Sequence, residues 1–167
     1  MALLKLVNRF FAARVAYAHC DIPCGIYDPH LAQIAALTTI RMNQLIEGLQ
    51  KPGSDASPQE VASYNAALGR YITTKEEHAE LCKKEIRIIW GDYFRPEHVE
   101  QHPDLHAKVF QVMKVGSRVR QNVDGQAAQD LLAAVQEVAE IFWATKGVQT
   151  GRKPSNQAVG GELVSPA

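Results

Sequence analysis

The chain has few cysteines, no excess of charge of either sign and no long apolar run. Three cysteines, Cys20, Cys24 and Cys82, stand in 167 residues, too few and too unevenly spaced for the disulfide framework of a small secreted domain. Eighteen basic residues balance eighteen acidic ones, so the basic surface of a nucleic-acid-binding protein is not expected. No apolar run is long enough to span a bilayer, and we expect no stable membrane association.

One short segment concentrates the metal-binding chemistry of the chain. Residues 19–29 read HCDIPCGIYDP and place His19, Cys20 and Cys24 within six positions. Imidazole and thiolate are ligands for soft and borderline transition metals, so their density here predicts a redox-active metal site. The same spacing is compatible with a zinc site or with a disulfide between the two cysteines.

The eighteen residues before His19 have the character of a removable leader. Residues 16–18 read AYA, a small-x-small sequence of the kind that processing peptidases cut after. Cleavage there makes His19 the N-terminus, and its free amine then joins the ligand set. The apolar residues of the leader are interrupted by polar or basic ones, Lys5, Asn8, Arg9 and Arg14. We therefore interpret residues 1–18 as an amphipathic propeptide and expect a cytoplasmic protein, with export as the alternative that the AYA site favours.

Four long segments downstream carry apolar residues at spacings of three and four, which is typical of amphipathic helices. They begin after Asp28-Pro29, after a capping box at residues 57–60 (SPQE), after Pro103 and after a turn at residues 122–125. Whether Thr73 and Thr74 kink the second helix stays open. Short connections and the lack of a strand pattern predict an all-α fold, an antiparallel (up-down) four-helix bundle with an N-terminal metal-binding hook.

The two ends of this bundle are expected to be less regular. Residues 91–103 contain a glycine and two prolines and are predicted to be irregular. Residues 148–167 are rich in glycine, proline and serine, which predicts a flexible C-terminal tail. No histidine has a glutamate three positions before it, so a ferritin-like di-iron site inside the bundle is excluded.

The segment HCDIPCGIYDP behind a short leader resembles the nickel-binding hook of the nickel superoxide dismutases. Further matches follow downstream, at residues 75–81 (KEEHAEL), 90–96 (WGDYFRP), 103–106 (PDLH) and 141–146 (IFWATK). The resemblance therefore covers residues 19–147, with the hook at residues 19–27.

This resemblance implies a superoxide dismutase, an oxidoreductase that converts superoxide into dioxygen and hydrogen peroxide by a Ni(II)/Ni(III) ping-pong cycle. It implies one nickel ion per subunit, bound by the amine of His19, the backbone nitrogen and thiolate of Cys20 and the thiolate of Cys24. The His19 imidazole is then an axial ligand of the oxidised metal. Thiolates and a deprotonated amide donate strongly and stabilise nickel(III). Cleavage before His19 is obligatory in such an enzyme, because in the precursor its nitrogen is a peptide amide.

The resemblance also assigns neighbours and partners to the metal. Tyr27 and Tyr93 match family positions that crowd the open face of the metal, and Asp21 and Asp92 match residues that fix the hook. The implied assembly is a homohexamer, and the implied partners are a processing peptidase and a nickel-delivery route.

One departure from the family pattern concerns the axial imidazole. Many members support it with a glutamate on the first helix and an arginine on the second, and the matching positions here are Ala35 and His78. We expect His78 or a water molecule to hydrogen-bond to His19 instead.

Two other functions stay open on the sequence. One is a metal-binding or metal-delivery protein for nickel or zinc that has the same hook but no turnover. The other is a structural bundle whose N-terminal loop is closed by a disulfide. Cys82 is expected to be a packed or half-exposed thiol without a role. Three histidines spaced by four are expected to lie on the surface: His98, His102 and His106.

Overall fold

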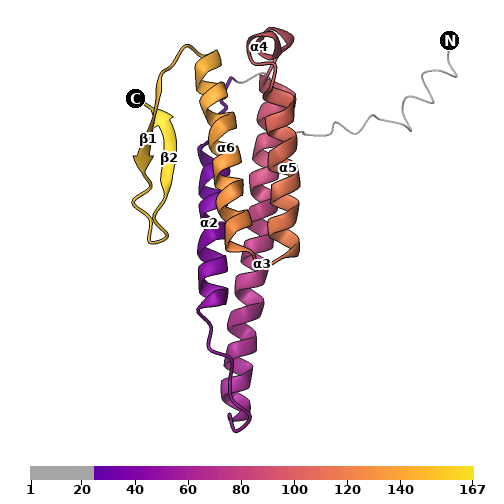
Figure 1. Ribbon diagram of the computed structural model, residues 1–167, viewed down its shortest axis with the longest axis vertical. Helices are drawn as coiled ribbons and strands as arrows, with labels where there is room; N and C mark the ends of the chain where they lie inside the picture. The colour runs from indigo at the N-terminus through magenta and orange to yellow at the C-terminus, as the bar shows by residue number, and fades with distance from the viewer. Residues whose placement is uncertain (1–24) are drawn as a thin grey trace, which may run out of the picture.

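The computed structural model describes residues 25–167, and four long helices dominate this part of the chain (Figure 1). They are α2 (His30–Glu47), α3 (Pro58–Ile88), α5 (Leu105–Gln121) and α6 (Gly125–Thr145). Two short helical segments, the π-helix η1 (Ile89–Tyr93) and α4 (Pro96–Gln101), join α3 to α5. The chain closes with two strands, β1 (Thr150–Pro154) and β2 (Glu162–Pro166).

The four long helices form a closed antiparallel bundle. Each packs on the next along the chain, α2 on α3, α3 on α5 and α5 on α6, and α6 completes the ring by packing on α2. The predicted up-down four-helix bundle is therefore confirmed. Its interior is mostly apolar and includes Ala36, Ile40, Ala79, Ile86, Val112, Leu131, Val135 and Phe142. None of the described helices is both long and apolar enough to cross a membrane.

Helix α3 begins with the predicted capping box. The backbone N–H of Glu60 donates to Ser57 Oγ at 3.3 Å, and the Glu60 carboxylate accepts from the Ser57 N–H at 2.8 Å. Each side chain thus pairs a backbone donor that the first helical turn leaves free. The helix then runs without a break through Thr73 and Thr74, and its first turns project beyond the other three helices (Figure 1).

The connection after α3 is more regular than predicted. The end of α3 continues into the wider π-helical turn of η1, where the Phe94 N–H donates to the Ile89 carbonyl five residues earlier at 3.2 Å. Pro96 then occupies the first turn of α4, where its missing N–H costs nothing. The expectation of irregular structure over residues 91–103 is therefore wrong for most of this segment.

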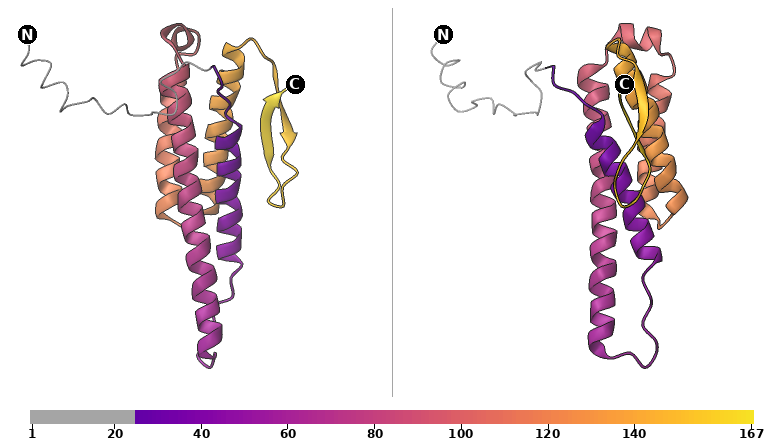
Figure 2. Two further views of the ribbon diagram at one scale, coloured as in Figure 1. Left: turned by 180° about the vertical axis from the view of Figure 1, so that it is seen from behind. Right: turned by 90° about the vertical axis from the view of Figure 1, so that its left-hand side faces the viewer.

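The structure also overturns the flexible tail predicted for residues 148–167. Strands β1 and β2 pair as an antiparallel hairpin that lies against α2 and α6 (Figure 2). Gln33 of α2 binds both backbone groups of Val164: its Nε2 donates to the carbonyl at 3.0 Å, and its Oε1 accepts from the N–H at 2.7 Å. Gln136 of α6 donates to the Glu162 carbonyl at 2.8 Å. These two glutamines supply the free edge of β2 with the partners that a third strand would provide.

Candidate metal centre

Two tyrosines far apart in the sequence meet at the end of the bundle where α2 begins and η1 ends. The ring centroids of Tyr27 and Tyr93 lie 5.6 Å apart at an interplanar angle of 52°, and both side chains are half-buried. Asp28 accepts a hydrogen bond from the His30 N–H at 2.7 Å, which fixes the start of α2 three residues after Tyr27. The structure therefore brings together the two tyrosines that the sequence assigns to the site.

The ring of Tyr93 is enclosed on several sides. His98 of α4 stacks on it at 5.5 Å and 21°, while Phe142 of α6 lies 4.7 Å and Phe94 5.3 Å from its centroid. The Lys146 ammonium lies 5.4 Å from the same centroid, within the range of a cation–π contact. These contacts come from three separate segments, so the position of the ring is set by the packing of the whole end of the bundle.

The hydroxyl of Tyr93 reaches the last turn of α6. Its oxygen lies 2.9 Å from Thr145 Oγ1, and the Thr145 hydroxyl donates to the Phe142 carbonyl at 2.7 Å. These two bonds link the Tyr93 phenol to the Phe142 carbonyl in the last turn of α6.

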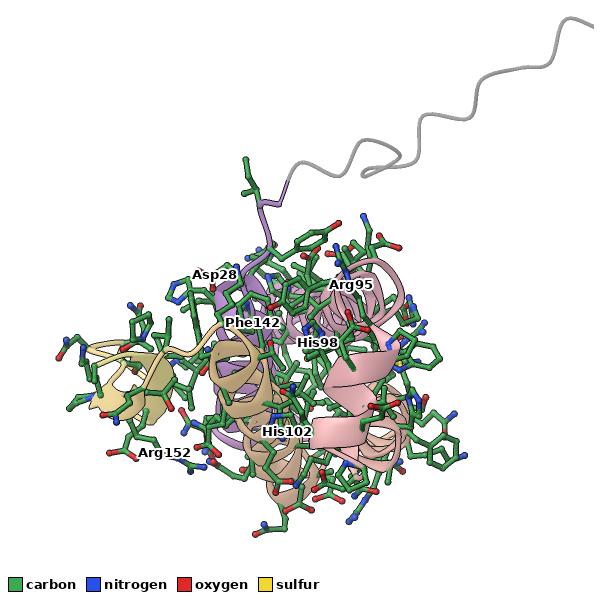
Figure 3. All side chains as sticks on the ribbon, turned by 90° about the horizontal axis from the view of Figure 1, so that it is seen from above. Asp28, Arg95, His98, His102, Phe142 and Arg152 are labelled. Atoms are coloured by element: carbon green, nitrogen blue, oxygen red, sulfur yellow. The ribbon has the colours of Figure 1, made fainter. Side chains whose placement is uncertain are left out.

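An open cleft of about 360 Å³ lies beside the two tyrosines. Acidic and basic side chains both line it. Seen from above, Arg95 and His98 lie on this end of the bundle (Figure 3). Gly25 has a φ of +72°, a conformation that favours glycine, and it follows Cys24 directly in the chain. The lining residues are Gly25, Tyr27, Asp92, Tyr93, Arg95, Glu97 and His98.

The predicted metal ligands lie outside the part of the chain that the structure describes, as does the predicted hook residue Asp21. Those ligands are His19, Cys20 and Cys24. Within residues 25–167, no three His, Cys, Asp or Glu side chains gather closely enough to hold a metal ion. The donor types that the sequence offers in the hook, two thiols and an imidazole, fit nickel, which accepts nitrogen and thiolate ligands.

The two positions that depart from the family pattern are both described. Ala35 is fully buried in α2. His78 is half-buried, and its Nδ1 lies 2.9 Å from the Thr74 carbonyl of its own helix. Because a carbonyl only accepts, Nδ1 carries a proton, which leaves Nε2 for a further partner. The proposed contact between His78 and His19 stays a prediction.

Three residues at this end of the bundle were not predicted to belong to the site. His98 was predicted to be a surface histidine, but it is half-buried and stacks on Tyr93. Thr145 and Lys146 stand in the motif IFWATK, which carries the family resemblance but shows no role by itself. Their roles depend on the π-helix that turns Tyr93 toward α6, and no local sequence signal predicts that turn.

Cys82 is packed in the core, which is one of the two placements expected from the sequence. It is fully buried. Burial is the main cause that raises the pKa of its thiol to about 12, and the negative charge of the nearby Glu85 contributes. A thiol in this state is a poor metal ligand, because the thiolate is the binding form.

The fold and the site together define a class of protein. In the sequence, a segment with two thiols and an imidazole directly precedes Gly25, and Gly25 lines a cleft with two tyrosines at the end of an antiparallel four-helix bundle. This arrangement is typical of a redox metalloprotein whose predicted ligands precede the bundle in the sequence, in contrast to bundles that hold metals between their helices.

Comparisons with known proteins specify this class. A family model described as nickel-containing superoxide dismutase matches residues 14–146. Two proteins named nickel superoxide dismutase are similar: that of Streptomyces coelicolor is 33% identical over 142 residues and that of Streptomyces seoulensis 34% over 145, each match covering 84% of this chain and 98% of the relative. A native nickel superoxide dismutase structure has a TM-score of 0.66 at 32% identity, covering 77% of this chain and 99% of that one.

The chain belongs to the nickel-containing superoxide dismutase family. It is an oxidoreductase with nickel as its cofactor, and the prediction made from residues 19–29 is confirmed at this level. The C-terminal hairpin lies beyond the family match, which ends at residue 146.

Proposed function

We propose that the mature enzyme begins at His19 and disproportionates superoxide at the mouth of the tyrosine-lined cleft. The observation that carries this proposal is the meeting of Tyr27 and Tyr93 beside Gly25, the residue that follows Cys24. His19, Cys20 and Cys24 would hold the metal and Asp21 would fix the hook, and the neighbouring cleft would give access to a small anion and water.

The proposed reaction balances over two steps. One superoxide gives up an electron and leaves as dioxygen, and a second takes up that electron and two protons to become hydrogen peroxide. One nickel ion per subunit, when bound, supplies the Ni(II)/Ni(III) one-electron cycle that makes the mechanism ping-pong. The protein binds the anion, excludes larger oxidants and delivers protons from solvent through the polar side chains of the cleft.

Removal of residues 1–18 is part of this proposal. As long as Ala18 is attached, the nitrogen of His19 is a peptide amide and cannot serve as an amine ligand. We infer that a processing peptidase cuts after the AYA sequence, that the mature chain is a homohexamer and that it acts in the cytoplasm. The support for the peptidase is the cleavage sequence, and the support for the hexamer is the family resemblance.

The test compares three nickel-reconstituted chains: the full-length chain, a chain beginning at His19 and a chain beginning at Ala18. The last keeps every ligand side chain and lacks only the free amine of His19. Dismutase activity at about one nickel per chain in the His19 form alone supports the proposal. Equal activity in the Ala18 form contradicts the role of the amine. Nickel binding without turnover in the His19 form favours the metal-delivery alternative.

A further inference from the structure

The hydroxyl groups of Tyr93 and Thr145 form a chain with a defined direction. A threonine hydroxyl has one hydrogen to donate. The Phe142 carbonyl, 2.7 Å from Thr145 Oγ1, has only lone pairs, so the Thr145 hydrogen is used there. At the 2.9 Å contact between the two hydroxyls, Tyr93 is therefore the donor and Thr145 the acceptor.

The enclosure of the Tyr93 ring makes this direction matter for the cleft. With His98 stacked on the ring and Phe142 at 4.7 Å, the ring has little freedom to turn. A phenol hydrogen lies close to the plane of its ring, so it has two orientations, and the bond to Thr145 selects one of them. The lone pairs of the phenol oxygen are left to accept a hydrogen bond.

We propose that Thr145 is a positioning residue for superoxide dismutation: it holds the phenol hydrogen of Tyr93 toward α6, so that Tyr93 presents a hydrogen-bond acceptor to the cleft. The inference rests on the proposed function, because it takes this cleft as the place of reaction. Tyr93 then orders a water molecule that donates to its oxygen. Protons for the reduction of superoxide come through such water, and the phenol keeps its own proton throughout the cycle.

An acceptor at this point also affects the binding of anions. Superoxide and azide carry negative charge and bind best to donors. With its hydrogen turned toward Thr145, Tyr93 offers them none, which favours rapid release. Loss of the Thr145 hydroxyl frees the phenol hydrogen to donate into the cleft, and anions then bind more tightly while the ordered water is lost.

The test uses two substitutions of Thr145 and one matched control in chains that begin at His19. Thr145→Val removes the hydroxyl and keeps the shape, and Thr145→Ser keeps the hydroxyl. Thr38→Val in α2 is the control, because the Thr38 hydroxyl makes the same kind of bond, to the Ile34 carbonyl at 2.9 Å, away from the cleft. We expect T145V to lower both kcat and KM and to bind azide more tightly, each by about fivefold, the factor of one ordinary hydrogen bond. T145S and T38V should stay near the parent values.

A second readout needs no metal. In the metal-free protein, the Tyr93 hydroxyl proton should give a slowly exchanging NMR signal that T145S retains and T145V loses. Unchanged kcat, KM and azide affinity in T145V, or a parent protein without that proton signal, would overturn the inference. If the parent chain binds nickel but shows no dismutase activity, the proposed function fails, and the NMR signal still decides the direction of the hydroxyl chain.

Discussion

Lys75 is the one charged side chain that is buried within residues 25–167, with an exposed fraction of 2%. Its ammonium donates to the Val119 carbonyl at 2.8 Å and to the Asn122 carbonyl. These carbonyls belong to the end of α5, where the last turn has no helical partners and the helix dipole is negative. Lys75 therefore caps α5 from the neighbouring helix, and burial lowers the pKa of its amino group.

We expect Lys75→Met to lower the free energy of unfolding by about 1–3 kcal/mol, because it leaves buried carbonyls without a donor. Lys84→Met on the exposed side of the same helix is the control and should change the free energy of unfolding little.

The lowered pKa of Lys75 should also make the free energy of unfolding depend on alkaline pH. Between the folded pKa and 10.5, the folded state binds fewer protons than the unfolded state, so the free energy of unfolding rises with pH in this range. Urea titrations at several alkaline pH values should show that slope in the parent and not in K75M. An equal slope in both chains would contradict this account.

The C-terminal hairpin is held to the bundle by side chains outside its own sequence, those of Gln33 and Gln136. Gln33→Leu removes both hydrogen bonds to Val164, a residue that is 2% exposed. We expect the free energy of unfolding to fall by about 1–3 kcal/mol and the Val164 amide proton to exchange much faster. Gln44→Leu, on the exposed face of α2, is the matched control. Protection of the Val164 amide that survives in Q33L would show that the apolar packing of the hairpin suffices.

Elements that depend on residues nearby in the sequence were predictable, and elements that depend on distant side chains were not. The start of α3 was predictable because Ser57 and Glu60 cap it within four residues, and the helices were predictable from their apolar spacing. The hairpin was not, because its strands are short and mostly polar and its partner Gln33 is 131 positions from Val164. The cleft was predictable only in part. Tyr27 and Tyr93 stand in motifs that resemble the family, whereas His98 and Thr145 contact Tyr93 only because the π-helix η1 places its ring between α4 and α6.

At the scale of the whole molecule, the two ends of the bundle differ in character. The end with the cleft is aromatic and open, while a polar cluster ties all four helices together at the turn between α5 and α6. Asp124 starts α6 by accepting from the Ala127 N–H at 2.9 Å, pairs with Arg118 of α5 at 2.5 Å and donates its own N–H to Asn43 of α2 at 3.1 Å. Lys75 adds α3 through the carbonyl of Asn122. The cluster fixes the bundle away from the site, so changes there should act on stability before they act on catalysis.

Asp124 should make the stability of the whole bundle depend on acidic pH. The hydrogen bond from the Ala127 N–H and the charge of Arg118 hold the pKa of its carboxyl below the ordinary value of 3.8. A lowered pKa contributes stability that is present above 3.8 and is lost as pH falls through the folded pKa. Near pH 7 we expect Asp124→Ala to lower Tm most. Asp124→Asn should lower it less, because asparagine still caps the helix but has no charge for Arg118.

The decisive measurement is the Tm of the parent and of D124N from about pH 7 down to about pH 2.5, followed by circular dichroism. As Asp124 takes up its proton, the parent loses the charge that D124N lacks at every pH, so the two curves should converge at the acid end. Curves that stay parallel over the whole range would show that the ionic contact with Arg118 does not hold the turn. In that case the turn between α5 and α6 would be joined to α2 by the hydrogen bond from the Asp124 N–H to the Asn43 side chain, which both chains keep.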